Sequence, residues 1–529
     1  MKRSALEFAP HGAVRQKGEI AERLARQIAR LESDMYLPPL VFESQSIDTW
    51  PGDWEGRAML SQTLTAMATG REPAHLDAAM EQLAKALNGN GFLGRKLPHP
   101  QADEQQLSGH GWLLRALCSY YEYKKSDATL FLIEGVVSNL FLPLRETYRE
   151  YPTDPALRTG GGAASGHVFA TSGNWHLSTD TGCAYIPLDG LTHAYCIYPE
   201  SPMRQMLGEM LGEMIEKFLS LDPVGMKLQT HATLTATRGI LRMYFAEGKE
   251  KYLEAAKRIF EQYLAHGMTV NYENQNWFLR PEWTEPCAIV DSFMVASQLY
   301  AATGDEKYLP IINRILYNGM LRTQRCNGGF GCDSCATDGV LTAHDYEAWW
   351  CCSMRGGEGL SACARYAYMI KEDTIVVPYM TDSEADLTVL GKKVHVCCKT
   401  QYPYACRATY TVSGETDGIK LAIYLPGKGL CTFTPDGNGV VEICEELHVQ
   451  KEKPAVGEGG YVLMLGDLML GRATDPTPFK NRILRDGYAD LIPLCESTWL
   501  DKETLCKTPL QLVFEGQWLK CTKNQLGVW

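Results

Sequence analysis

A repeated helical hairpin constrains the fold of this chain more than any other feature of its sequence. Tyr244-Phe-Ala-Glu-Gly248, followed by Lys251-Tyr252-Leu253, recurs 56 residues later as Tyr300-Ala-Ala-Thr-Gly304, followed by Lys307-Tyr308-Leu309. Each copy has the pattern of a helix, a glycine-containing turn and a second helix. Such units bury their apolar faces by stacking on like units. The repeat therefore predicts a closed toroid of paired helices, an (α/α) barrel, with an open solenoid as the alternative.

The hydrophobic periodicity divides the chain into two parts. Apolar residues at i, i+3, i+4 and i+7 spacing predict helices over 57–70, 76–89, 109–123, 206–221 and 252–267. After about residue 370 the period changes to two, for example in Thr374-Ile-Val-Val and Lys420-Leu-Ala-Ile-Tyr-Leu, with turn signals such as Ser413-Gly414 between the runs. We expect an α+β multidomain protein: an (α/α)6 helical barrel over 1–368, packed against an antiparallel β-sandwich over 369–529.

Composition narrows the class of protein. The 529 residues are 45% hydrophobic and 22% charged, as in globular proteins, and the net charge is -12. Such an acidic chain is a poor ligand for nucleic acid phosphates and suits a neutral or cationic small molecule. The N-terminal residues lack the apolar core of an export signal, and no run of about 18 apolar residues follows. We therefore expect a cytoplasmic protein without a membrane partner, whose 18 cysteines are mostly thiols.

Two short motifs carry the sharpest chemical signal. Thr284-Glu285-Pro286-Cys287 precedes an apolar helical run, and proline at the first helical position marks a helix start. Trp349-Trp350-Cys351-Cys352 precedes another helical run. Glu285, Cys287, Cys351 and Cys352 would together supply one oxygen and three sulfurs, a set that suits tetrahedral zinc.

Spacing by itself does not establish a metal site at these thiols. Buried, inert cysteines are the more common outcome, and a second vicinal pair, Cys397-Cys398, lies in a predicted strand without obvious partners. A rival metal site is also available, because Cys326, Cys332 and Cys335, with His344 nearby in sequence, could form a zinc knuckle on a glycine-rich loop.

Several motifs, in order, resemble those of glycoside hydrolase family 127, the β-L-arabinofuranosidases, over most of the chain. His110 in SGHGWLLRALCSYYEYKKS and His231 in THATLTATRGILRMYF resemble two of the family's helix starts. Thr284-Glu-Pro-Cys287 resembles its Glu-Thr-Cys motif, Arg314-Ile-Leu-Tyr-Asn318 its Arg-x-Leu-Tyr-Asn motif, and Thr400-Gln-Tyr-Pro-Tyr its Thr-x-Tyr-Pro-Trp motif. Cys351-Cys352 stands where the family has its cysteine pair.

The resemblance implies a zinc site and roles for single residues. Glu285, Cys287, Cys351 and Cys352 would be zinc ligands, with Cys351 also the nucleophile. The acid/base would be Glu273, with Glu282 as the fallback. His110 and His231, and also His193, would hydrogen-bond sugar hydroxyls, although each could instead be a satisfied core histidine. Asp53 and Trp54, in an aromatic and acidic loop, also suit a sugar pocket.

The function implied is a retaining glycoside hydrolase of the β-L-arabinofuranosidase type, acting on a small glycoside or oligosaccharide, with a homodimer as one possible assembly. A lyase or epimerase on the same barrel, or a non-catalytic glycan binder with structural zinc, are the alternatives. The chain also departs from the family. Asn313 replaces a glutamate, no tyrosine occurs from 318 to 345, and the cysteine pair is followed by Ser-Met where the family has Pro-Pro. Because of these departures, the sequence does not identify the sugar that the protein would act on.

Overall fold

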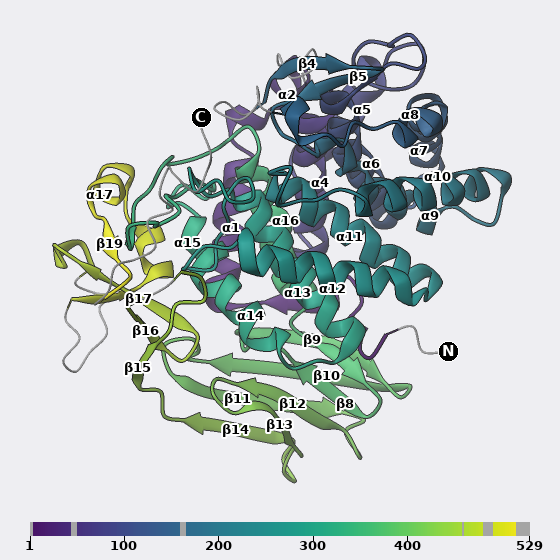
Figure 1. Cartoon of the computed structure of the whole chain (residues 1–529). Coiled ribbons are helices and arrows are strands. Elements are labelled where there is room, and N and C mark those ends of the chain that lie inside the picture. The colour runs from purple at the N-terminus through teal and green to yellow at the C-terminus, as the bar shows by residue number, and fades with distance from the viewer. Residues whose placement is uncertain (1–3, 44–49, 159–165, 458–459, 480–489, 515–529) are drawn as a thin grey trace.

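The computed structural model describes residues 4–43, 50–158, 166–457, 460–479 and 490–514. A helical barrel fills the upper part of Figure 1, and green strands lie beneath it. The predicted fold class is confirmed.

Six inner helices form a closed ring in which each contacts the next and the last contacts the first. In ring order they are α4 (Asp53–Thr69), α6 (Glu104–Lys124), α9 (Pro187–Ile197), α11 (Thr230–Glu247), α13 (Pro286–Thr303) and α16 (Cys352–Arg365). One outer helix packs on each of them: α5 (Leu76–Ala86), α7 (Asp127–Val136), α10 (Pro202–Leu219), α12 (Glu250–His266), α14 (Tyr308–Arg314) and α1 (Gly18–Leu31), respectively. The closed barrel is therefore correct, and the open solenoid is not.

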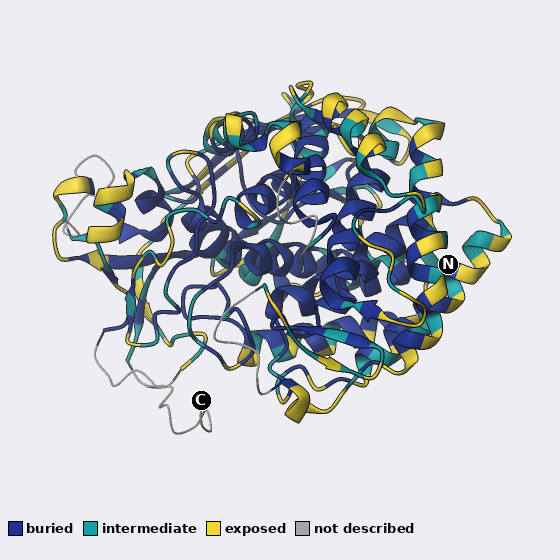
Figure 2. Cartoon of the chain, turned by 90° about the horizontal axis from the view of Figure 1, so that it is seen from above, coloured by how far each residue is buried: buried dark blue, intermediate teal, exposed yellow. Residues whose placement is uncertain are grey.

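Glycines let neighbouring inner helices approach closely. A side chain on Gly56 of α4 would meet the backbone of Leu113 on α6 at 2.4 Å, and one on Gly239 of α11 would meet the backbone of Leu188 on α9 at 2.6 Å. Seen from above, the ring is almost wholly buried, and the exposed residues lie on the outer helices and loops (Figure 2). The shorter helices are α2 (Pro38–Phe42), α8 (Arg145–Arg149), α15 (Leu321–Thr323) and α17 (Lys502–Lys507).

Two five-stranded sheets make up the region below the barrel. One has the order β1 (Glu7–Phe8), β7 (Met369–Lys371), β8 (Thr374–Val377), β12 (Lys420–Leu425) and β13 (Gly429–Phe433). The other has the order β14 (Val440–Glu445), β11 (Cys406–Gly414), β10 (Lys392–Thr400), β9 (Ser383–Val389) and β2 (Val14–Gln16). All pairs in them are antiparallel except β8 with β12. Two strands from the start of the chain thus complete sheets that were predicted from the C-terminal part alone.

Two further sheets are smaller or more irregular. The third has the order β15 (Val449–Glu452), β16 (Val462–Leu465), β17 (Leu468–Ala473), β19 (Leu510–Gln511) and β6 (Val340–Leu341), with β18 (Leu491–Pro493) also on β17. The fourth contains β3 (Ala102–Asp103), β5 (Trp175–Ser178) and β4 (Val168–Ser172). Barrel and sheets are joined by an ion pair of 3.0 Å between Arg314 Nε and Asp467 Oδ1.

One helical stretch, Asp127–Arg149, is long and apolar enough to cross a membrane by length and composition. It contains α7, which packs against α6, and α8, which packs against α10. The buried core helices of other proteins can be equally long and apolar, so this stretch is weak evidence for a membrane span.

Candidate metal centre

Two helix starts bring the predicted ligands together. Glu285 is the N-cap of α13, with Pro286 in the first turn, and Cys287 follows one residue later. Cys351 is the N-cap of α16, and Cys352 is its first residue. Because α13 and α16 are neighbours in the ring, their N-terminal ends meet at one mouth of the barrel. One ligand atom from each of the four residues lies within 4.8 Å of all the others.

The spacing of the sulfurs fits a tetrahedral metal. Cys287 Sγ lies 3.7 Å from Cys352 Sγ, and Cys351 Sγ lies 3.3 Å from Cys352 Sγ. Zinc–sulfur bonds of about 2.3 Å place two sulfurs of a tetrahedron about 3.8 Å apart. Burial raises the pKa of the Cys287 and Cys352 thiols well above the usual thiol range. A cation is therefore the partner that would keep these sulfurs deprotonated.

Polar side chains surround the Glu285 carboxylate. His231 Nδ1 lies 3.3 Å from Glu285 Oε1, and the amides of Gln229 and Asn276 reach Oε2. His231 is 1% exposed and stacks on Trp112, with ring centroids 5.5 Å apart. In metal sites a second layer of such contacts orients the ligand. The structure thus gives His231 a carboxylate partner, and its predicted contact with a sugar hydroxyl stays a prediction.

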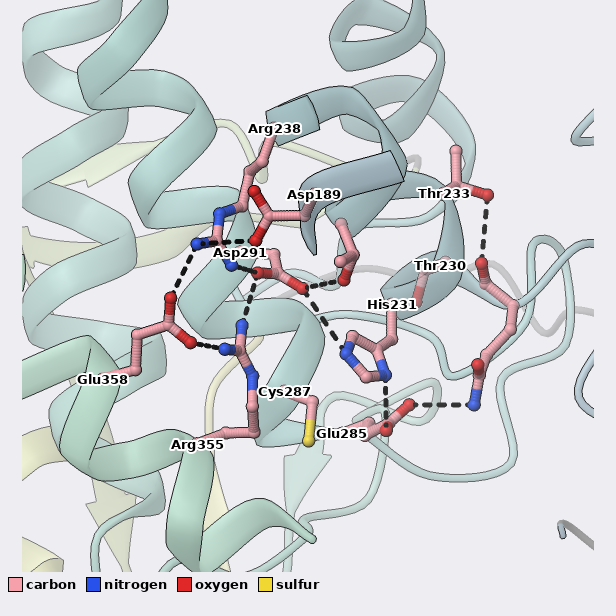
Figure 3. Close-up of polar contacts among 12 residues, drawn as sticks. Asp189, Thr230, His231, Thr233, Arg238, Glu285, Cys287, Asp291, Arg355 and Glu358 are labelled. Carbon is pink, nitrogen blue, oxygen red and sulfur yellow. Dashed lines mark hydrogen bonds and ion pairs between the residues drawn. The ribbon is translucent and has the colours of Figure 1, made fainter. Parts of the chain in front are cut away.

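A layer of buried charges lies next to this cluster, inside the ring (Figure 3). Asp291 Oδ1 accepts hydrogen bonds from Arg238 Nη1 at 2.7 Å and from Arg355 Nη2 at 2.5 Å. Glu358 Oε1 accepts from Arg238 Nη2 at 2.6 Å, and Asp189 Oδ2 lies 2.9 Å from Arg115 Nε. Burial alone would raise the pKa of Asp291, but the Arg355 and Arg238 guanidiniums hold it below its usual value. Hereafter Arg115, Asp189, Arg238, Asp291, Arg355 and Glu358 are called the charge layer.

Arg57 is a neighbour of the thiols that the sequence analysis missed. Its Nη1 lies 3.4 Å from Cys287 Sγ, and its guanidinium forms a two-point ion pair with Asp53, at 2.7 and 3.1 Å. Asp53 is thus engaged with Arg57, although it lies beside the predicted site. Trp54, one residue on, packs against Trp349 with ring centroids 5.0 Å apart. The Asp53-x-x-x-Arg57 spacing, which places both residues on one helix face, was the available sequence signal for this ion pair.

The two acid/base candidates have different surroundings. Glu273 is fully buried, and burial together with the neighbouring Asp333 carboxylate raises its pKa well above the usual range. Glu282 is half-buried, and its Oε1 pairs with Arg280 Nη2 at 2.7 Å. A general acid must hold a proton at working pH, so these surroundings favour Glu273 over Glu282.

Two of the predicted sugar-binding histidines lie apart from the thiols. Both ring nitrogens of His110 are engaged by backbone: Nδ1 with the Gln106 carbonyl at 2.8 Å and Nε2 with the Leu93 amide at 3.0 Å. His193 bridges Arg115 and Glu122 beside the charge layer. Burial lowers the pKa of each to about 4. His110 fits the alternative of a satisfied core histidine, and a sugar contact of either residue stays a prediction.

The thiols of the rival knuckle have separate partners. Cys326 Sγ lies 3.0 Å from the Tyr346 hydroxyl, Cys335 Sγ lies 3.8 Å from the Asn274 carbonyl, and the His344 ring stacks on Trp283. Within the described ranges, the Glu285 cluster is the one group of potential ligands that converges. Cys332 instead lies within hydrogen-bonding reach of Cys352, so this region contributes a fourth thiol next to the candidate site.

Asn313, which departs from the family pattern, is not part of this site. Its amide donates to the carbonyls of Leu309 and Pro378, each at 2.9 Å. Tyr402 of the sheet region lies 3.4 Å from its side-chain oxygen. Asn313 therefore belongs to the junction between barrel and sheets.

The fold and the cluster define an (α/α)6-barrel protein with a candidate metal centre at one mouth. Residues 221–365 match the family model described as beta-L-arabinofuranosidase, GH127 catalytic domain. That match spans α11 to α16 and contains all four predicted ligands. The match agrees with the predicted resemblance to this family of glycoside hydrolases over this part of the chain.

Solved structures agree with the fold. A GH127 beta-arabinofuranosidase superposes with a TM-score of 0.66 at 12% identity, covering 90% of this chain and 86% of that one. A GH127 beta-L-arabinofuranosidase from Geobacillus stearothermophilus T6 has a TM-score of 0.57 at 15% identity, covering 87% and 86%. A third structure, described only as a glycoside hydrolase, has a TM-score of 0.64 at 13% identity, covering 89% and 84%. No curated protein sequence matches the chain.

Proposed function

We propose that this protein is a retaining glycoside hydrolase of the β-L-arabinofuranosidase type, with zinc held by Glu285, Cys287, Cys351 and Cys352. The convergence of these four donors within 4.8 Å carries the proposal. When bound, zinc keeps the thiols deprotonated and lowers the basicity of sulfur, which makes a thiolate a better leaving group.

Exposure selects the nucleophile among the three cysteines. Cys287 and Cys352 are 0% and 1% exposed, whereas Cys351 is partly exposed. Only a sulfur that a sugar can reach can attack its anomeric carbon. Cys351 is therefore the cysteine that suits the nucleophile, and the two buried cysteines suit purely structural ligands.

Two displacements account for the reaction. In the first, the Cys351 thiolate forms a carbon–sulfur bond as the glycosidic carbon–oxygen bond breaks, and Glu273 gives its proton to the leaving oxygen. In the second, the Glu273 carboxylate takes a proton from water, which attacks the anomeric carbon and releases the thiolate. Each displacement inverts the anomeric centre, so the configuration is retained overall.

Aromatic side chains near Cys351 suit a small glycoside. Trp54 and Trp349 are packed together, and Trp350, which is 49% exposed, lies against Trp349 with ring centroids 5.6 Å apart. Aromatic faces bind the apolar faces of sugar rings without requiring a charge, which agrees with a neutral substrate.

Metal content tests the site before any substrate is known. Protein purified without added metal should contain one zinc per chain, and Cys352→Ser should lose it. Cys363→Ser is the matched control, because Cys363 is a fully buried thiol on the same helix whose Sγ donates to the Gly359 carbonyl, away from the cluster. Zinc that persists in Cys352→Ser, or wild-type protein that contains none, would refute this site.

Activity then tests the two catalytic roles on aryl α- and β-L-arabinofuranosides. Cys351→Ala should abolish turnover of the β-anomer, and Glu273→Gln should lose at least about a hundredfold in kcat, the usual contribution of a general acid. Glu282→Gln should keep most activity. The opposite order of the two glutamate variants would move the acid/base role to Glu282.

A further inference from the structure

A cavity lies at the opposite mouth of the barrel from the thiols. It has a volume of about 500 Å³ and is lined by the C-terminal halves of all six inner helices together with the N-terminal segment Ser4–Val14. That segment is held in place by backbone hydrogen bonds from Leu6 to Ala301, at 2.9 Å, and from Ala9 to Tyr368, at 3.3 Å. The cavity is large enough for a molecule of sugar size, since a water takes about 30 Å³.

The charge layer separates this cavity from the candidate metal centre. Arg115, Arg238 and Glu358 of that layer form its inner wall. On α16, Cys352 belongs to the metal cluster and Arg365 to the cavity. With a rise of 1.5 Å per residue, these two positions are about 20 Å apart. A ligand in the cavity would thus be remote from the thiols.

Arg365 and Gln298 line the cavity, and each has one polar atom, buried in the cavity wall, that lacks a hydrogen-bond partner among the described residues. Nη1 of Arg365 is a buried donor, and Oε1 of Gln298 is a buried acceptor, while the amide nitrogen of Gln298 donates to the Tyr366 hydroxyl at 3.0 Å. Burial lowers the pKa of Arg365, and the nearby Tyr366 and Glu122 oppose this shift only in part. Leaving such groups unpaired costs about 1–3 kcal/mol each, and a ligand that pairs them recovers this cost.

The remaining lining groups distinguish a neutral ligand from an anion. The Arg115, Arg238 and Arg242 guanidiniums already pair with Asp189, and His193 pairs with Glu122 at 3.1 Å. Six helices also end here, and their carbonyl ends disfavour negative charge. A carboxylate would accept from Arg365 but give nothing to Gln298, whereas a hydroxyl both accepts and donates. Phe8, Phe245 and Tyr366 add aromatic walls.

We propose that this cavity is a second, non-catalytic binding site for a neutral, hydroxyl-rich ligand of monosaccharide size, held by Arg365 and Gln298. The site is independent of the reaction at Cys351 and does not rest on it.

Saturation-transfer NMR with D-glucose at millimolar concentration tests this site on the full chain. Wild type and Cys351→Ala should both transfer saturation to the sugar. Arg365→Met and Gln298→Met, which keep the bulk of each side chain but remove its polar end, should each weaken binding about tenfold, the effect of one lost hydrogen bond. Arg258→Met, an exposed arginine on α12, is the control and should bind as wild type does. Circular dichroism checks that each variant folds. If one of the two cavity variants fails to fold, the other still tests the proposal.

Three outcomes would overturn the proposal. The first is binding that Cys351→Ala abolishes, because the sugar would then sit at the thiols. The second is binding unchanged in both cavity variants, or no saturable binding at all. The third is binding of D-glucuronate or inorganic phosphate in preference to D-glucose, because the cavity would then be an anion site.

Discussion

Asp291→Asn would test whether the stability of the fold depends on a carboxylate that neutralises the buried arginines of the charge layer. Asp291 is 0% exposed, and its carboxylate faces two guanidiniums, those of Arg238 and Arg355. The second oxygen accepts from the Thr235 hydroxyl at 2.7 Å. Asparagine has nearly the same shape but no charge, so the substitution leaves two buried cations facing a neutral amide without creating a cavity.

The expected cost follows from these contacts. A hydrogen bond to a charged group contributes about 1.5–3 kcal/mol, and Asp291 makes one with each arginine. Removing one partner of a buried ion pair costs about 3–5 kcal/mol in measured cases, within the range that the two bonds give together. We therefore expect Asp291→Asn to lower the free energy of unfolding by about 4 kcal/mol.

Urea denaturation followed by tryptophan fluorescence measures this loss as a shift of the midpoint. Asp386→Asn is the matched control: the Asp386 side chain is 86% exposed and pairs with His395 at 2.9 Å, so its loss should cost less than about 1 kcal/mol. Removing Arg355 as well should cost less than the two single changes together, because the partners share one ion pair. If Asp291→Asn unfolded at the same urea concentration as Asp386→Asn, the layer would not depend on this carboxylate.

Three further predictions concern residues near the N-terminal ends of the inner helices, where the candidate metal centre lies. Burial raises the pKa of Glu55 from 4.5 to about 8, so the folded state holds a proton that the unfolded state releases; the stability from this group is full below pH 4.5 and falls as the pH rises to about 8. Glu55→Gln should flatten that part of the stability curve, and an unchanged slope in urea titrations at pH 5 and pH 8 would argue against it. His231→Ala should weaken zinc binding about 10- to 100-fold in competition with a chelator, through its contact with Glu285, while His110→Ala should leave the affinity unchanged. Cys332→Ser should retain one zinc per chain by elemental analysis, because Cys332 neighbours Cys352 without belonging to the four-ligand set; loss of zinc would make it a ligand.

The sequence predicted the elements well where one pattern decided them. Period 3.6 located five helices, although α6 begins at Glu104, five residues before the predicted start, because the side chain of Asp103 caps it. Thr374–Val377 and Lys420–Leu425 are strands with the predicted bounds. The N-terminal strands β1 and β2 were missed because strands of two and three residues carry no periodicity, and only pairing with β7 and β9 defines them.

The four residues that the sequence analysis grouped do converge in the structure, but their surroundings were predicted less well. Proline after Glu285 marks the helix start, so Glu285 and Cys287 were correctly predicted to lie at the N-terminus of a helix. Contacts between distant helices could not be predicted in the same way. Nothing near Arg57 in sequence points to Cys287, and nothing near His231 distinguishes a sugar hydroxyl from the carboxylate that it faces.

The position of a residue along its inner helix helps to explain which predicted site residues lie together at the mouth of the barrel that holds the thiols. Each inner helix returns through an outer one, so all six run the same way and their N-terminal ends share one mouth. Cys352, Cys287 and His231 are first or second residues of their helices and meet there. His193, the seventh residue of α9, instead lines the cavity at the opposite mouth. The helix dipoles add a second reason, because thiolates and carboxylates are stabilised at N-terminal ends and arginines at C-terminal ends. The helix starts are not level, since Trp112, the ninth residue of α6, stacks on His231, the second residue of α11. The mouth at which a residue lies therefore depends on where its helix begins as well as on its position along the helix.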